Sequence, residues 1–302
     1  MANLEDFKGM SFDRENFSDF HGATARELAI LIGSAYAQFE QQGEGTWSLP
    51  DGFNGVTELT HDRKKKVFGF VATKDEDAFI IIRGTRTAYE WYNNTAIKYD
   101  KYISVAGKKW GITTKGFYSI YLDIREEIEA VLATLSNAKH IFIAGHSLGG
   151  ALATLIIPDL IDSGIDPNKI IVYTFASPRC CDRELATKLN YSGVQHWRIA
   201  NTEDIIPTLP GSTANIFSIE RPVSPEEVEE NFIVKTYNDL KTRGMKTLEH
   251  TGNPIYFTIG TDSIQDNHNL EFVYMTGIGQ DSASVPKKQL KQISKKMAEI
   301  VK

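Results

Sequence analysis

Residues 141–150 read IFIAGHSLGG, and the arrangement of the whole chain can be worked out from this stretch. A short apolar run leads into Gly-His-Ser-Leu-Gly at residues 145–149, and a second apolar segment follows. G-x-S-x-G between a strand and a helix is the pattern of a nucleophile elbow, a strained turn that exposes a serine hydroxyl. We expect Gly145 and Gly149 to remove side chains where the strand and the helix cross, so that the turn presents Ser147 as a nucleophile. The alternative is a glycine-rich turn with an incidental serine.

Strand-like and helix-like segments alternate around the elbow. Before it, the apolar spacing predicts a helix over residues 23–42, a β-hairpin of strands 67–73 and 78–83, and a helix over residues 123–135. At and after it, the spacing predicts strands over residues 141–144, 170–175, 194–200 and 254–259 and helices over residues 148–161, 183–189 and 225–245. The alternation predicts one α/β domain over residues 1–302, with a mostly parallel central sheet and helices on both faces.

The composition is that of a folded chain without a basic bias. Hydrophobic residues make up 41% of the 302 residues and the formal net charge is −6. A sizeable core is therefore available, and no nucleic-acid partner is expected, because such a partner requires a strongly basic face. The longest apolar runs are far shorter than the roughly 20 residues that cross a bilayer, so we do not expect a transmembrane protein.

Cysteine usage and the N-terminal sequence bear on location and cofactors. Cys180 and Cys181 are adjacent and cannot form an ordinary disulfide. The N-terminal stretch lacks the apolar core of a secretory signal. We therefore expect a cytoplasmic protein, or one secreted without a recognisable signal in this sequence. No histidine or cysteine cluster has zinc-ligand spacing, so no metal and no other cofactor is expected.

A nucleophilic serine needs a base and an acid that orients the base, and behind such an elbow they follow in the order acid, then histidine. Only His250 and His268 follow the serine with room for an acid between. We expect His146 to point away from the elbow and His196 to be a packed residue of its strand.

The expected acid is Asp204. It follows the strand predicted over residues 194–200 and precedes Pro207, so a stiff turn would hold its carboxylate at the carboxyl end of a strand, where loops converge on a site. Glu203 is the neighbouring alternative.

Four motifs occur in one order along the chain: IIIRGT at residues 80–85, KGFYSIY at 115–121, GHSLGGALAT at 145–154 and NTEDIIPTLP at 201–210. Together they resemble the class 3 (fungal-type) triacylglycerol lipases, and the resemblance covers roughly residues 68–278. It implies an α/β-hydrolase fold with a short helical lid. It also implies a serine carboxylic-ester hydrolase that cleaves acylglycerols through a Ser-Asp-His triad and an acyl-enzyme intermediate.

The resemblance assigns roles to residues of this chain. It implies Ser147 as the nucleophile, Asp204 as the acid and His268 as the base, with His250 as the alternative base. The backbone N–H of Leu148 is the first expected oxyanion donor, because it follows the nucleophile. The resemblance places the second donor at Thr85, through its amide and its hydroxyl.

The implied lid covers residues 86–96. Tyr89, Trp91 and Tyr92 supply apolar area that a lipid interface attracts; the alternative is that these rings pack on the domain. Asn94 stands where many members of the family have an aspartate that supports the oxyanion hydroxyl. An asparagine oxygen accepts the same hydrogen bond without a charge.

The C-terminal residues 282–302 form a basic tail, for which a solvated terminal helix and a membrane-surface helix are the two interpretations. The expected partners are a lipid or ester substrate and, peripherally, a lipid interface; the oligomeric state is left open. Within the same enzyme class, phospholipase A1 and short-chain carboxylesterase are alternatives. From another class, the alternative is a catalytically silent, lipase-like binding or signalling module.

Overall fold

The computed structural model describes residues 20–41, 47, 49–61, 66–85, 98–210, 247–261 and 263–278. Up to the elbow the elements are α1 (Gly22–Glu40), β1 (Asn54–His61), β2 (Lys66–Lys74), β3 (Asp77–Ile82), β4 (Tyr99–Ile103), β5 (Lys109–Thr114), α3 (Lys115–Ala130), α4 (Leu132–Asn137) and β6 (Ile141–His146). From the elbow on they are α5 (Leu148–Asp162), β7 (Ile170–Phe175), α6 (Arg183–Asn190), β8 (Gln195–Asn201), β9 (Asn253–Phe257), α8 (Ile264–Asn267), a π-helical turn (Leu270–Tyr274) and α9 (Met275–Ile278). Short 3₁₀ turns cover Pro167–Lys169 and Ile206–Thr208.

The central sheet has seven strands in the order β1-β2-β3-β6-β7-β8-β9. The first two pairings are antiparallel, and all pairings from β3 to β9 are parallel. Strands β4 and β5 form a separate antiparallel ribbon. Because β3, β6, β7 and β8 run in parallel, the loops that follow them meet at one edge of the sheet, which is where α/β sheets place their sites.

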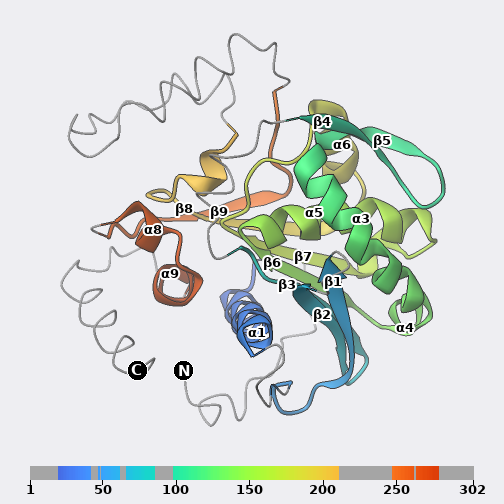
Figure 1. The fold of residues 1–302 in the computed structure, drawn as a ribbon, viewed down its shortest axis with the longest axis horizontal. Helices are drawn as coiled ribbons and strands as arrows, with labels where there is room; N and C mark the ends of the chain where they lie inside the picture. The colour runs from blue at the N-terminus through green and yellow to red at the C-terminus, as the bar shows by residue number, and fades with distance from the viewer. Residues whose placement is uncertain are drawn as a thin grey trace.

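Helices cover both faces of the sheet, as the alternation predicts (Figure 1). Ile141 and Ile143 of β6 belong to the core under α3 and α5, whereas Phe142 and Ala144 belong to the core under α1. Successive side chains of a strand point to opposite faces, so a continuous apolar strand serves two cores.

Most predicted elements are present within two residues of their expected ends, including the hairpin of β2 and β3 and the run from β6 to β8. The helix predicted over residues 123–135 is different. Helix α3 starts eight residues earlier at Lys115, where the Thr114 hydroxyl accepts from the Phe117 N–H, and it ends at Ala130 before the separate short helix α4. Strands β1, β4 and β5 were not predicted; β4 and β5 carry exposed charged residues that hide the alternation of a strand.

Three expected segments lie outside the described residues: the lid over residues 86–96, the helix over residues 225–245 and the tail over residues 282–302. Within the described ranges no helix combines the length and the hydropathy that a membrane span requires. The same ranges contain no group of three or more histidine, cysteine or carboxylate side chains that would hold a metal ion.

Candidate active site

Ser147 stands between β6 and α5 in a strained backbone conformation, with φ +57° and ψ −125°. Its N–H donates to the carbonyl of Phe175 on β7, which fixes the turn against the sheet. A Cβ added to Gly145 would lie 2.1 Å from the Gly149 carbonyl oxygen, and one added to Gly149 would lie 2.4 Å from the Ile82 carbonyl oxygen. Two glycines are therefore required for the close crossing that holds the serine in this conformation.

The loop after β3 lies directly against the serine. Ile82 pairs with Gly145 in the parallel ladder, so the residues that follow Ile82 meet the elbow. A Cβ added to Gly84 would lie 2.8 Å from the Cβ of Ser147. Thr85, the expected second oxyanion donor, is the next residue in the chain. Leu148 opens α5, and the N–H groups of the first turn of a helix have no acceptor within that helix.

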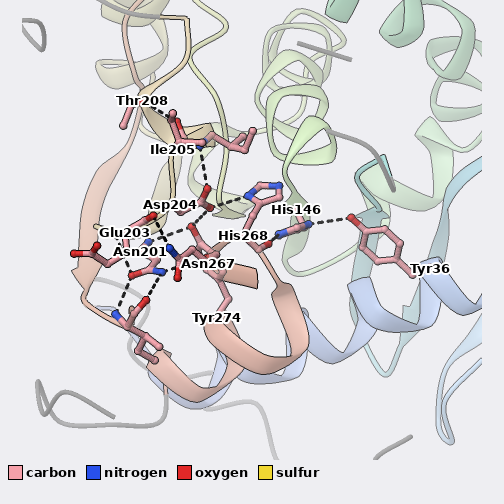
Figure 2. Close-up of polar contacts among 12 residues, drawn as sticks. Tyr36, His146, Asn201, Glu203, Asp204, Ile205, Thr208, Asn267, His268 and Tyr274 are labelled. Atoms are coloured by element: carbon pink, nitrogen blue, oxygen red, sulfur yellow. Dashed lines mark hydrogen bonds and ion pairs between the residues drawn. The ribbon is translucent and has the colours of Figure 1, made fainter. Parts of the chain in front are cut away.

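Asp204 is 2% exposed and sits in the turn after β8 (Figure 2). Its Oδ1 accepts from the N–H of Ile206 at 2.9 Å. Its Oδ2 is 2.7 Å from Nδ1 of His268 and also accepts from the hydroxyl of Tyr274 at 2.7 Å. Three hydrogen-bond partners thus converge on one buried carboxylate and fix its orientation. Glu203, the alternative acid, has its side chain on the other side of the turn, away from His268 (Figure 2).

The imidazole of His268 is oriented by that carboxylate. An ionised carboxylate only accepts, so Nδ1 of His268 donates to Asp204 and Nε2 of the neutral ring is left as an acceptor. Nε2 makes no hydrogen bond with the described residues, and neither does Oγ of Ser147 nor Oγ1 of Thr85, although all three atoms are buried. Buried polar atoms without partners are rare and need an explanation. Here they are the three atoms that the sequence suggests as base, nucleophile and oxyanion donor.

His146 makes no hydrogen bond with Oγ of Ser147, in keeping with the expectation that it points away from the elbow, but it lies next to His268. Its ring lies against the ring of His268 with centroids 4.7 Å apart, and its Nε2 is 3.0 Å from the His268 carbonyl oxygen (Figure 2). Its Nδ1 is 2.9 Å from the hydroxyl of Tyr36 in α1. Strand β6 ends at His146 with the side chain on the face that carries α1, and the π-helical turn after His268 packs on that same face through Leu270, Val273 and Tyr274.

The hydrogen-bond directions around His146 follow from its partners. A carbonyl oxygen only accepts, so Nε2 carries the proton and donates to His268. Burial, and then the nearby charge of His268, lower the pKa of His146 well below its usual value, so the ring is neutral and Nδ1 accepts. The hydroxyl of Tyr36 therefore donates to Nδ1, and its oxygen accepts from the Gly84 N–H at 2.9 Å.

The other two histidines considered are placed elsewhere. His250 donates from Nε2 to the Pro207 carbonyl at 2.8 Å, and burial lowers its pKa well below the usual value. It therefore anchors the loop after Asp204 and has no carboxylate partner among the described contacts. His196 is buried in β8 and contacts the hydroxyls of Thr174 and Thr251, as a packed strand residue would.

Four residues singled out in the lid lie outside the described residues, so the structure gives them no position: Tyr89, Trp91, Tyr92 and Asn94. Sequence reasoning in turn missed three members of the site, Tyr36, His146 and Tyr274. Tyr36 and Tyr274 lie far from the motifs in the chain, and only tertiary packing brings them to it. A signal existed for His146 alone, since it immediately precedes the serine.

Comparison with known proteins shows what this chain is similar to. The family model described as Lipase (class 3) matches residues 79–214. The lipase of Rhizomucor miehei is 29% identical over 143 residues, which cover 45% of this chain and 38% of the relative. The chloroplastic phospholipase A(1) DAD1 of Arabidopsis thaliana is 30% identical over 151 residues, covering 45% of this chain and 34% of the relative. The chain thus spans little more than a third of the length of these two relatives.

A solved structure of Rhizomucor miehei triacylglyceride lipase has the same fold. The TM-score is 0.57 at 21% identity, and the match covers 79% of this chain and 82% of that chain. At this identity the likeness concerns the fold, which is that of the α/β hydrolases. The family match spans the loop after β3, the elbow and Asp204. The chain is therefore similar to the class 3 lipases over residues 79–214 and shares the fold of the solved fungal lipase.

Proposed function

We propose that the chain hydrolyses carboxylic esters of lipids, acylglycerols first, with Ser147 as nucleophile, His268 as base and Asp204 as the acid that orients it. One observation carries the proposal. An oriented imidazole, bound to a buried carboxylate at 2.7 Å, lies beside a strained elbow whose serine hydroxyl has no other partner among the described residues. A base held by a third group next to an activated hydroxyl is the arrangement that acyl transfer requires.

In the first step Oγ of Ser147 attacks the ester carbonyl carbon while its proton passes to Nε2 of His268. The bond from Nδ1 to Asp204 stabilises the imidazolium that forms. The carbonyl oxygen becomes an oxyanion between the N–H of Leu148 and the backbone and hydroxyl of Thr85. Each such donor lowers the barrier by roughly 2.7–4 kcal/mol.

The second half of the reaction reverses these roles. His268 gives its proton to the leaving alcohol, which departs and leaves Ser147 acylated. A water molecule then passes a proton to Nε2 of His268 and attacks the acyl carbon. The same oxyanion donors stabilise the second tetrahedral intermediate. Its collapse breaks the bond to Oγ of Ser147, which takes the proton back from Nε2 of His268, and the free acid is released.

Phospholipase A1 activity is the second candidate, because the chain also resembles plant proteins named phospholipase A1 at the same level of identity as the fungal lipase. Both activities use the same triad on the same ester bond. The choice between lipase and phospholipase A1 activity depends on the lid and the pocket. In either case we propose that the chain binds its substrate at a lipid–water interface. A catalytically silent module would lack a triad member or an oxyanion donor; every candidate is present here.

Hydrolysis of three substrates tests the proposal: p-nitrophenyl butyrate, p-nitrophenyl palmitate and a phosphatidylcholine emulsion, each with wild type, Ser147→Ala, His268→Ala and His250→Gln. Loss of a triad member is expected to lower kcat by about 1,000-fold or more. His250→Gln is the matched control, since glutamine can still donate to the Pro207 carbonyl. A wild type inert on all three substrates would contradict the proposal and favour the silent module. Cleavage of phosphatidylcholine in preference to the two p-nitrophenyl esters would favour phospholipase A1.

A further inference from the structure

The backbone of Gly84 is held by a side chain on each side. Its N–H donates to the hydroxyl oxygen of Tyr36 at 2.9 Å, and its carbonyl accepts from Nη1 of Arg83 at 2.6 Å. The residue is also packed against the nucleophile, since an added Cβ would lie 2.8 Å from the Cβ of Ser147 and 2.5 Å from the Tyr36 hydroxyl. Both peptide groups that flank this glycine are therefore fixed.

The hydrogen bond from Arg83 to the Gly84 carbonyl also sets the direction of the Thr85 N–H. In a planar trans peptide the C=O of Gly84 and the N–H of Thr85 point in opposite directions. Arg83 is itself immobilised, because its Nε donates to the Val67 carbonyl at 2.8 Å and its guanidinium lies 3.6 Å from the ring centre of Phe39. As long as the carbonyl faces Arg83, the N–H of Thr85 is turned to the other side.

The orientation of a peptide group needs fixing most at a glycine. Without a Cβ, Gly84 has the widest choice of backbone conformations in the loop, so its peptide groups rotate at little steric cost. A rotated Gly84–Thr85 peptide would present a carbonyl oxygen instead of an N–H to a developing oxyanion, and the two oxygens would repel each other. Preorganised donors are effective because they need no reorientation during the reaction.

We propose that Tyr36 and Arg83 are positioning residues that lock the Gly84–Thr85 peptide with the Thr85 N–H directed at the oxyanion site. This inference rests on the proposed esterase function. Tyr36 also links this loop to His268, because its hydroxyl donates to His146 and Nε2 of His146 donates to the carbonyl of His268. One continuous chain of hydrogen bonds thus fixes the oxyanion loop and the base relative to each other.

Binding of butylboronic acid tests the proposal separately from turnover, because its tetrahedral serine adduct places a charged oxygen at the oxyanion position. Tyr36→Phe removes both hydrogen bonds of the hydroxyl and keeps the ring. Arg83→Met keeps the apolar stem of the side chain but removes its hydrogen-bond donors, whereas Arg83→Lys keeps a charged donor. The control is Tyr118→Phe in α3. The Tyr118 hydroxyl likewise makes two hydrogen bonds, accepting from the N–H of Ile103 and donating to its carbonyl.

The expected result for Tyr36→Phe is about a 10-fold lower kcat and about a 10-fold weaker affinity for boronate, with KM within about 2-fold of wild type. Arg83→Lys is expected to retain more of both than Arg83→Met, and Tyr118→Phe to match wild type. Tm is measured for each variant, and if the Arg83 variants do not fold, Tyr36→Phe decides. Wild-type kcat and boronate affinity in Tyr36→Phe would overturn the proposal while the triad stands. A wild type that neither hydrolyses esters nor binds boronate would overturn the proposed function, and this inference with it.

Discussion

At the scale of single residues, the site depends on which group donates each hydrogen bond. Burial, and then the charge of Asp204, raise the pKa of Tyr274 well above its usual value, so the hydroxyl keeps its proton and donates to the carboxylate. The Tyr274 oxygen accepts in turn from the N–H of Asn201 at 3.1 Å, which fixes it to the end of β8. Tyr274 therefore shares Oδ2 of Asp204 with His268 and holds the carboxylate at the correct rotation.

We predict that Tyr274→Phe lowers kcat/KM for p-nitrophenyl butyrate by roughly 10-fold at neutral pH, because a hydrogen bond to a charged group contributes about 1.5–3 kcal/mol. Steady-state kinetics measure the effect. The matched control is Tyr102→Phe, which removes a buried hydroxyl that donates to the Leu155 carbonyl at 2.6 Å. Equal activities of the two variants would show that Tyr274 has no particular role toward Asp204.

At the scale of elements, the sequence predicts the parts whose burial is uniform. Strands β3, β6 and β7 are buried along their full length, and their apolar runs identify them directly. Strand β4 has a single buried position, Tyr102, and contains charged residues, so its pairing with β5 is decided by tertiary contacts. The sequence motifs identify Ser147 and Asp204 as candidates. The position of His146 depends on its contact with Tyr36 of α1, and no local sequence pattern connects α1 to the elbow.

The crossing of β6 and α5 gives a prediction for the elbow. Gly149→Ala would bring a Cβ within 2.4 Å of the Ile82 carbonyl oxygen, so we expect the free energy of unfolding to fall by about 1–3 kcal/mol or more, with loss of activity as the elbow shifts. Urea denaturation and ester hydrolysis measure the two effects. Gly33→Ala in α1 is the control, because its Cβ would have no contact closer than 3.9 Å and a helical alanine is favoured by about 0.5–1 kcal/mol. Equal stability of both variants would contradict the close crossing.

At the scale of the whole molecule, neutral histidines are buried at several places in the fold. Burial, and then the charge of Arg198, lower the pKa of His196 to about 3. Above the usual pKa of about 6.5, His196 is neutral in both the folded and the unfolded chain and has no effect on stability. As the pH falls below that value, the unfolded chain binds a proton that the folded chain does not, so the free energy of unfolding decreases.

We predict that His196 alone lowers the free energy of unfolding by about 1.4 kcal/mol between about pH 7.5 and pH 5.5. Urea denaturation at the two pH values measures the difference. His196→Gln cannot bind this proton and can still reach the hydroxyls of Thr174 and Thr251. Its loss of stability over the same interval should be smaller by about that amount. The same loss in wild type and variant would mean that His196 binds its proton in the folded state too.

The most direct test of the central claim is the rate at which a p-nitrophenyl phosphonate forms a covalent adduct with Ser147, followed by p-nitrophenol release and located by peptide mass spectrometry. We predict one adduct, on Ser147, that forms at least about 100-fold more slowly in His268→Ala and within about 3-fold of the wild-type rate in His250→Gln. An adduct on another residue, or a wild-type rate in His268→Ala, would contradict the assignment of the nucleophile or of its base.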